Sequence, residues 1–183
     1  MTWAIEPLPV DGALFEGAIA VYGEAFTRPP YSDPDRGREV RKRIREQHLQ
    51  RAGFRLVGAV HDDQRVIAMA YGYHGAGGQW WHDTVCARVS RADRERWFSD
   101  SYEVVEVAVA PAFQSLGVGW AVVTALLEGR PESTAVLSTR TDSRAHILYG
   151  RLGFQVITEM RFALNGYPFY VMGKRLNLDP GAT

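Results

Sequence analysis

The chain has 183 residues, of which 46% are hydrophobic and 23% charged, so it can bury the core of one soluble globular domain. Its 21 Lys and Arg residues balance its 21 Asp and Glu residues, which argues against nucleic acid or an anionic membrane as a partner. Cys86 is the only cysteine, so a disulfide within the chain is excluded. No secretory leader pattern and no apolar run of membrane-spanning length is recognised, and we therefore expect a cytoplasmic protein.

The first part of the chain predicts two helices and a hairpin. Apolar residues recur at three- and four-residue spacings over 11–26, which is typical of an amphipathic helix. A second helix is expected over 32–53, from polar caps to a terminating glycine. Residues 54–60 and 66–73 predict two strands joined by the turn "HDDQR". Neither strand alternates cleanly between polar and apolar residues, so both faces of the sheet are expected to be covered.

The second part predicts further strands and helices in alternation. The glycine- and aromatic-rich stretch 73–86 is expected to lack regular structure. The elements expected after it are a charged helical linker over 90–100, a strand over 102–110, a helix over 118–127, a strand over 134–140, a helix over 143–153, and a closing hairpin of strands 154–164 and 168–176. Phe169 and Val171 on this hairpin could serve a homodimer or the core. These elements predict one α/β domain over residues 1–176 and a mobile tail over 177–183.

The turn between the expected strand 102–110 and the expected helix 118–127 contains the pattern Q-x-x-G-x-G. Amide N–H groups at such a helix start lack partners and lie at the positive end of the helix dipole, which makes an anion site. Gly117 and Gly119 have no Cβ, so a phosphate or pyrophosphate could approach the main chain closely. Neither the Rossmann fingerprint nor a Walker A loop is present. Because an isolated Gly-x-Gly turn usually serves tight packing, the loop alone does not decide the function.

A second cluster, "AHILYGRLGF", follows about thirty residues later. Together the two clusters resemble the GNAT superfamily of acyl-CoA-dependent N-acetyltransferases. Gln114, Gly117 and Gly119 match the pyrophosphate loop of that family, and its second motif is matched by Leu148, Tyr149, Gly153 and Phe154. The resemblance covers about 102–154. It implies a single GNAT-like α/β domain, with a mixed, mostly antiparallel central sheet and helices on both faces.

The resemblance also implies that acetyl-CoA is the co-substrate and that the loop binds it. The residues expected to do so are the main chain of Val107, Ala108 and Val109, which would meet the acyl carbonyl, and the loop and helix start at Gln114, Ser115, Leu116, Gly117, Val118, Gly119 and Trp120. Ser115 and Leu116 stand where many members carry basic residues. Amides and the helix dipole are therefore expected to hold the phosphates.

Acetyl transfer to an amine needs a base, a group that stabilises the oxyanion and an acid for the departing thiolate. In "YEVVEVAVA" the two-residue period of a strand places Glu106 in an apolar interior, where burial should raise its pKa and suit it to act as a base. The resemblance points to the same strand for the base and to Tyr149 for the acid. Glu103, expected to be more exposed, is the fallback base. Two alternatives stay open: Glu106 could form a structural ion pair with an arginine, and Tyr149 could be a core residue.

The acceptor site is expected in two aromatic-containing loops. Tyr31, Trp80, Trp81 and His82 could line it, although tryptophan packing over a short loop is at least as common. No metal is expected, because one cysteine beside one histidine falls short of a zinc ligand set. The helix over 35–51 carries seven Arg or Lys residues, which could steer an anionic acceptor or a protein partner, or simply form a solvated face.

The sequence therefore predicts an N-acetyltransferase that moves an acetyl group from acetyl-CoA to the primary amine of a small molecule by direct attack. A non-catalytic acyl-CoA-binding or sensing module is the alternative from another class. Peptide or protein amines, a longer acyl donor and an O-acceptor also stay open. A third reading, an anion-binding α/β protein unrelated to the family, would require the second motif to match by chance.

Overall fold

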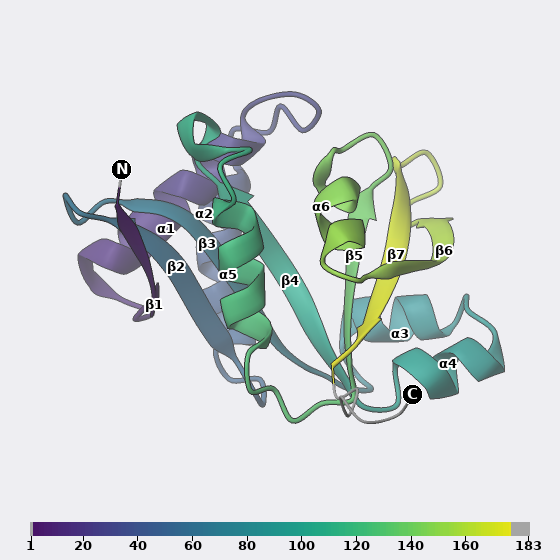
Figure 1. Ribbon diagram of the computed structural model, residues 1–183. Helices are drawn as coiled ribbons and strands as arrows, with labels where there is room; N and C mark the ends of the chain where they lie inside the picture. Colours follow the sequence, from purple (N-terminus) through teal and green to yellow (C-terminus); the bar gives the residue numbers. More distant parts are fainter. Residues whose placement is uncertain (1, 177–183) are drawn as a thin grey trace. The chain divides into compact units, whose positions relative to one another are not determined.

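The computed structural model describes residues 2–176, and the expected tail over 177–183 lies outside them. Seven strands form one sheet in the order β1-β2-β3-β4-β5-β7-β6 (Figure 1). The β1–β2, β2–β3, β5–β7 and β6–β7 pairings are antiparallel, whereas β4 and β5 are parallel. The chain divides into two compact units, residues 2–73 with 105–128 and residues 74–104 with 129–176, and β4 contributes to both. The α/β class and the mostly antiparallel sheet are confirmed.

The first unit holds the N-terminal strands, the second half of β4 and three helices. Its elements are β1 (Trp3–Pro7), α1 (Gly12–Phe26), α2 (Arg36–Arg43), a π-helical turn (Ile44–His48), β2 (Arg55–His61), β3 (Val66–Gly75) up to residue 73, the end of β4 (Ser101–Val109) and α5 (Val118–Leu127). Within this unit α1 and α2 cover one face of the strands, whereas α5 packs on the other, against β1 and β2 (Figure 1). The expected cover on both faces is confirmed here.

The second unit contains the remaining strands and three short helices. Its elements are the start of β4, α3 (Trp80–Cys86), α4 (Arg91–Trp97), β5 (Thr134–Arg140), α6 (Ala145–Arg151), β6 (Gln155–Arg161) and β7 (Pro168–Arg175). β4 pairs with β5 over three residue pairs, from Ser101 with Thr134 to Glu103 with Val136. A buried cluster joins α3 and α4 to β5, β6 and β7. Val171 is fully buried in that cluster, so it serves the core.

Several sequence expectations need correction. Residues 80–86 form α3 although irregular structure was predicted, because the glycines of that stretch end at Gly78 and leave a run that packs its apolar side on the core cluster. β1 was not predicted, since a five-residue edge strand containing proline has little sequence signal. The second helix begins later than predicted, at Arg36, and ends in a π-helical turn in which the amide of Leu49 donates to the carbonyl of Ile44 at 2.9 Å.

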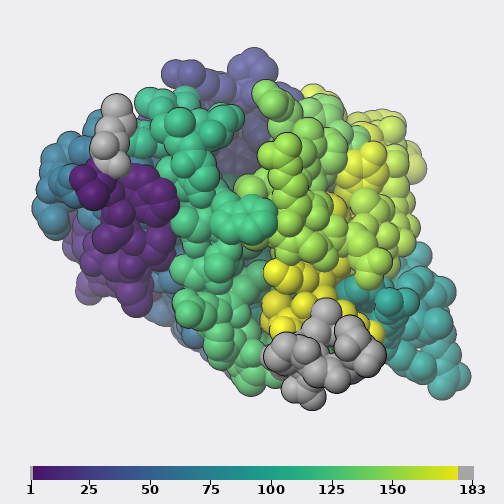
Figure 2. Space-filling view, viewed as in Figure 1, coloured from purple at the N-terminus to yellow at the C-terminus, as the bar shows by residue number. Residues whose placement is uncertain are grey.

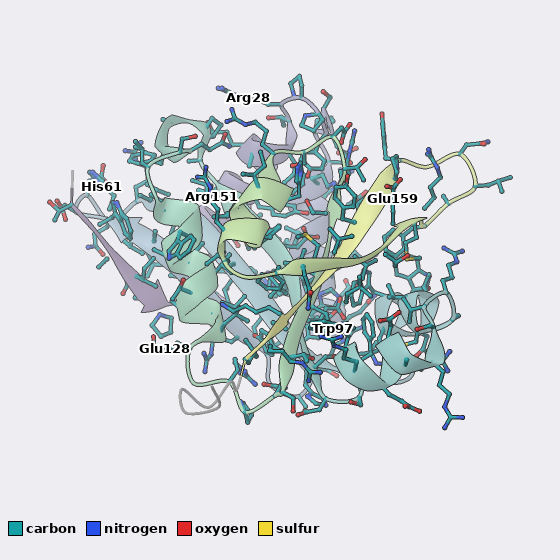
Figure 3. The ribbon with its side chains drawn as sticks, turned by 45° about the vertical axis from the view of Figure 1, so that its right-hand side comes forward. Arg28, His61, Trp97, Glu128, Arg151 and Glu159 are labelled. Atoms are coloured by element: carbon teal, nitrogen blue, oxygen red, sulfur yellow. The ribbon has the colours of Figure 1, made fainter. Side chains whose placement is uncertain are left out.

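Gly173 on β7 is required by close packing against α4. A Cβ added there would lie 2.6 Å from the indole of Trp97, which Figure 3 labels, and 2.9 Å from Ile157 Cδ1. Gly173→Ala is therefore expected to lower the free energy of unfolding by about 1–3 kcal/mol through overpacking. Gly77→Ala is the matched control in the same unit, because a Cβ there meets nothing within 4 Å. Urea unfolding measures both, and equal stabilities would contradict this packing.

Candidate active site

The loop between β4 and α5 is fixed in shape by hydrogen bonds to main-chain carbonyl groups of β3 and β4. The amide of Ala110 donates to the carbonyl of Ile67 on β3 at 2.8 Å, and a short 3-10 turn (Pro111–Phe113) follows. The side chain of Gln114 donates to the carbonyl of Val109 at 3.1 Å, which closes the loop on the end of the strand. Ser115 and Gly117 both have left-handed backbone, with φ of 63° and 84°. Left-handed residues at alternate positions can direct successive N–H groups into one concavity, which suits an anion.

Gly117 is the N-cap of α5, and the first helical bond runs from the amide of Ala121 to its carbonyl at 3.1 Å. The amides of the first helical turn, at Val118, Gly119 and Trp120, have no carbonyl one turn earlier to bind. They lie at the positive end of a ten-residue helix with no acidic residue in its first turn. A Cβ on Gly117 would meet nothing within 4 Å, so the approach to these amides is open. Figure 2 shows this loop and α5, in green, on the surface of the first unit.

Glu106 lies in the middle of β4, and its side chain is only 13% exposed. Nη2 of Arg43, at the end of α2, lies 3.2 Å from its Oε1. Burial raises the pKa of Glu106 above its ordinary value, whereas Arg43 and Arg36 oppose that rise. The expected burial and the alternative of an arginine ion pair are therefore both present at this carboxyl group.

Tyr22 of α1 connects the same carboxyl group to a second arginine. Its hydroxyl is hydrogen-bonded to Glu106 and accepts a bond from Nη1 of Arg36 at 3.3 Å. Burial, with Glu106 nearby, raises the pKa of Tyr22, so its phenol keeps its proton and can donate to the carboxylate. Three segments of the first unit, α1, α2 and β4, thus converge on Glu106.

Tyr149 and Tyr31 each pack against an aromatic ring of their own compact unit. Tyr149, on α6 of the second unit, is buried, and its ring meets that of Phe154 at 5.8 Å in a T-shaped contact. Tyr31, in the first unit, packs on Phe26 with ring centres 4.4 Å apart. Both residues have a packing role, and their catalytic or binding roles stay predictions.

The three predicted acceptor residues on α3 differ in exposure. Trp80 is 66% exposed, and its ring contacts that of Phe162, with ring centres 5.7 Å apart. Trp81 packs on the core cluster and donates from Nε1 to Ser138 Oγ at 3.0 Å. The ring of His82 lies 3.3 Å from the carbonyl oxygen of Phe98. Trp80 is thus the one of the three with most surface left for a ligand.

Comparison with known proteins decides the family. The model described as "Acetyltransferase (GNAT) domain" matches residues 55–156. A GCN5-like protein acetyltransferase of Mycobacterium tuberculosis is 31% identical over 193 aligned positions, in an alignment that covers 88% of this chain and 91% of that protein. The chain belongs to the GNAT acetyltransferase family. The resemblance seen in its two motifs is confirmed, and the family indicates an acyltransferase for which acetyl-CoA is the typical donor.

Solved structures agree on the GNAT fold at low sequence identity. A Corynebacterium glutamicum protein described as "histone acetyltransferase HPA2 and related acetyltransferase" matches with a TM-score of 0.67 and 20% identity, covering 98% of this chain and 99% of that one. A chain of the NatC complex bound to Gag peptide and CoA matches with a TM-score of 0.65 and 16% identity, covering 97% of this chain and 100% of that one.

The sequence did not predict which side chains surround Glu106. Arg43 and Tyr22 are 63 and 84 positions away in sequence, and nothing in the helical periodicity distinguishes Arg43 from the other basic residues of its helix. The expectation for Glu103 was wrong: it is only 4% exposed. Its position explains this, because it lies where β4 is paired with β5 inside the sheet.

His48 is a second buried polar side chain, close to Arg43. Nδ1 of His48, in the π-helical turn, is 3.0 Å from the hydroxyl of Tyr71 on β3, and its ring also meets Tyr73 at 5.0 Å. Burial, with help from Arg51 and Arg43, lowers the pKa of His48 from 6.5 to about 4. At neutral pH the imidazole is therefore uncharged, and its Nδ1 can accept a hydrogen bond from the Tyr71 hydroxyl.

This histidine is expected to make the protein sensitive to acid. Between pH 6.5 and pH 4 the unfolded chain binds a proton at His48 that the folded chain does not, so the free energy of unfolding falls by up to about 3 kcal/mol as the pH is lowered. His48→Phe keeps a ring between the tyrosines and should remove this part of the pH dependence, as urea unfolding at pH 7 and pH 4.5 would measure. His146→Phe, on α6, is the control that should keep it. An unchanged slope in His48→Phe would contradict a neutral buried imidazole.

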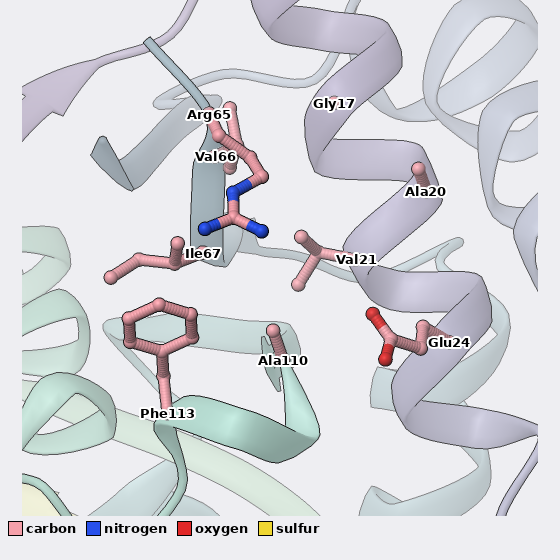
Figure 4. Close-up of a pocket in the computed structure, with 9 residues that line it drawn as sticks. All are labelled: Gly17, Ala20, Val21, Glu24, Arg65, Val66, Ile67, Ala110 and Phe113. Carbon is pink, nitrogen blue, oxygen red and sulfur yellow. The ribbon is translucent and has the colours of Figure 1, made fainter. Parts of the chain in front are cut away.

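A small pocket of about 190 Å³ lies where α1, the start of β3 and the end of β4 meet (Figure 4). Its wall is apolar except for Glu24 and Arg65, and none of the predicted site residues lines it. Within residues 2–176 no helix has the length and apolarity to cross a membrane. The same residues contain no group of three or more His, Cys, Asp or Glu side chains placed to hold a metal ion.

Proposed function

We propose that this GNAT chain transfers the acetyl group of acetyl-CoA to the primary amine of a small molecule, with Glu106 as the general base. One observation carries the proposal: the buried carboxyl group of Glu106 and the amide-lined start of α5 are built into the same compact unit, at the two ends of one strand-to-helix segment. A base and an anion site on one rigid segment are what transfer from an acyl-CoA requires. A cytoplasmic location is part of the same proposal.

The loop residues fit the donor by their chemistry. Acetyl-CoA supplies a thioester and a pyrophosphate, and the amides from Ser115 to Trp120 are the groups that would hold the latter. Their open approach at Gly117 supports this, since a side chain there would fill the space. No basic residue stands in the loop, so the affinity would depend on main-chain N–H groups and on the helix dipole.

The proposed reaction balances as follows. Glu106 accepts a proton from the acceptor ammonium, directly or through water, and the freed amine attacks the thioester carbon. Main-chain N–H groups of Val107 to Val109 would stabilise the tetrahedral oxyanion. When the carbon–sulfur bond breaks, Tyr149 would give its phenol proton to the thiolate and regain a proton from the attacking nitrogen, which still carries one in excess. Glu106 would then release its own proton to water. The products are an N-acetyl amine and the free thiol of CoA. The role of Tyr149 rests on its place in the GNAT motif.

A protein amine is the second candidate acceptor. The Mycobacterium tuberculosis relative, 31% identical, is described as a protein acetyltransferase, and this favours a protein amine as the acceptor. The proposal of a small amine rests on the recessed position of Glu106, whose side chain is 13% exposed. A sensing module would bind acetyl-CoA without turnover.

Thiol release from acetyl-CoA, measured against a panel of small amines and lysine-containing peptides, separates these functions. We expect amine-dependent release by the wild-type protein, with an acetylated small amine identified by mass spectrometry. Release with peptides alone would move the assignment to the protein acceptor. Saturable acetyl-CoA binding by calorimetry without release with any amine would favour the sensing module, and the proposed transferase would be wrong.

A further inference from the structure

Arg43 places a positive charge where the acceptor amine has to arrive. Its Nη2 donates a hydrogen bond to Oε1 of Glu106 at 3.2 Å. The acceptor ammonium has to bind the same carboxyl group, because Glu106 is the proposed base. Arg36 adds a second positive charge through Tyr22, although Asp33 partly compensates it at 3.5 Å. The neighbouring His48 is neutral and offers no compensation. A simple cationic amine would therefore meet repulsion from Arg43 at the site of reaction.

Arg43 also has unused binding capacity. Its side chain is 37% exposed, whereas that of Glu106 is 13% exposed, so Arg43 is the more accessible member of the pair. Its Nε is buried and has no hydrogen-bond partner among the described residues. A guanidinium group has five N–H donors arranged to bind a carboxylate through two parallel bonds. The contacts to Glu106 and to the Tyr22 hydroxyl use part of the group, and the unpartnered Nε shows that not all of its donors are used.

We propose that the acceptor is an amino acid, whose carboxylate binds Arg43 while its ammonium group binds Glu106. This inference rests on the proposed function and names its substrate class. The 3.2 Å contact between Oε1 and Nη2 shows that the two protein groups are neighbours, and an amine and a carboxylate on the same or adjacent carbon atoms can reach neighbouring groups together. On binding, the ammonium takes the place of Arg43 at Oε1, and the acceptor carboxylate supplies the negative charge that Arg43 gives up.

A site of this kind would disfavour other classes of amine. A lysine side chain in a protein has no carboxylate near its ammonium group, and a polyamine adds positive charge beside Arg43. Arg43 is a specificity residue that touches the acceptor and is not a base or an acid in the reaction. Other basic residues of α2 and of the π-helical turn are paired elsewhere: Arg38 with Asp35, and both Arg41 and Arg45 with Glu16.

The test compares each proteinogenic amino acid with its α-amide and with the decarboxylated amine. Thiol release is measured for wild type, Arg43→Gln, Arg43→Lys and Arg38→Gln. We expect kcat/KM for the accepted amino acid to exceed that of its amide at least tenfold. Arg43→Gln should abolish this ratio, mainly through a higher KM for the acid, and Arg43→Lys should restore part of it. Arg38 is 79% exposed, so Arg38→Gln should leave the ratio unchanged.

The ratio is used because Arg43→Gln also changes Glu106. Without Arg43 the pKa of Glu106 rises further, which lowers the rate for acid and amide alike but does not alter their ratio. Equal rates for acids and amides in the wild type, or an unchanged ratio in Arg43→Gln, would overturn the proposal.

Calorimetric binding of the amino acids in the presence of CoA separates this inference from the proposed function. If no amine supports thiol release but an amino acid binds, and binding is lost in Arg43→Gln, the transferase proposal fails and the amino-acid site stands. If release occurs only with amines that lack a carboxylate, the transferase stands and the amino-acid site is wrong. If neither release nor amino-acid binding is found, both are wrong.

Discussion

Glu106→Gln is expected to lower kcat by roughly a hundredfold to ten-thousandfold, the usual contribution of a general base. The amide has the size and shape of the carboxyl group but cannot accept the ammonium proton. Acetyl-CoA affinity should change little, because the loop from Gln114 to Trp120 is separated from Glu106 by the remainder of β4 and a 3-10 turn. Steady-state thiol release and calorimetry on the same preparation measure the two quantities.

A loss of rate must be distinguished from a loss of structure. The substitution leaves Arg43 without its counter-charge, but that side chain is 37% exposed and water can solvate it, so the protein should stay folded. Thermal unfolding checks this. Glu103→Gln is the matched control, because it changes the other carboxyl group of the same strand. If Glu103→Gln loses the activity and Glu106→Gln keeps it, the base has been assigned to the wrong residue.

The pH profile gives the same assignment independently. Burial raises the pKa of Glu106, so on lowering the pH the base is protonated before an ordinary glutamate would be. The kcat/KM of the wild type should therefore fall on an acid limb whose midpoint lies above 4.5, the ordinary glutamate value. The sign for stability is opposite to that for activity: the folded chain binds this proton more tightly than the unfolded chain, so the contribution of Glu106 to stability is present at low pH and is lost as the pH rises through the folded pKa.

The sequence predicts the bounds of helices and strands well where a periodic apolar pattern is clear and a glycine marks its end. Residues 118–127 and 134–140 are a helix and a strand with the predicted bounds, and left-handed Gly129 and Gly153 end α5 and α6 as expected. Failures occur where tertiary contacts decide. α3 forms because its apolar side packs on the core of the second unit, and β1 forms because β2 offers an unpaired edge; neither partner is visible in the local sequence.

The candidate site divides in the same way. The loop and Glu106 were predicted, because a glycine pattern and a carboxylate in an apolar strand are local signals. Arg43, Tyr22 and His48 were not, because each reaches the site from a helix or a π-helical turn far away in sequence. A helical pattern shows which side of a helix is apolar, but it does not say which basic residue at the margin faces a buried carboxyl group. The specificity proposed here therefore depends on contacts that only the structure supplies.

Gly117→Trp is expected to weaken acetyl-CoA binding at least a hundredfold, which is the second large effect. Gly117 caps α5 with φ of 84°, a conformation that costs any residue with a Cβ about 1–3 kcal/mol. Because a Cβ there meets nothing within 4 Å, the indole fits the free protein without a clash at its root. The indole would cover the amides from Ser115 to Gly119, and a pyrophosphate could no longer reach them.

Gly117→Ala separates occlusion from strain. Alanine has the same backbone penalty as tryptophan but adds only a methyl group, so both variants should lose similar stability in urea unfolding while only Gly117→Trp loses the ligand. Calorimetry with CoA and acetyl-CoA gives the two affinities. If the alanine and tryptophan variants bind equally well, the amides of this loop do not hold the phosphates, and the donor site has to lie elsewhere. If both lose binding, the left-handed backbone at Gly117 itself aligns the amides, and the loop's shape matters more to affinity than the space above it.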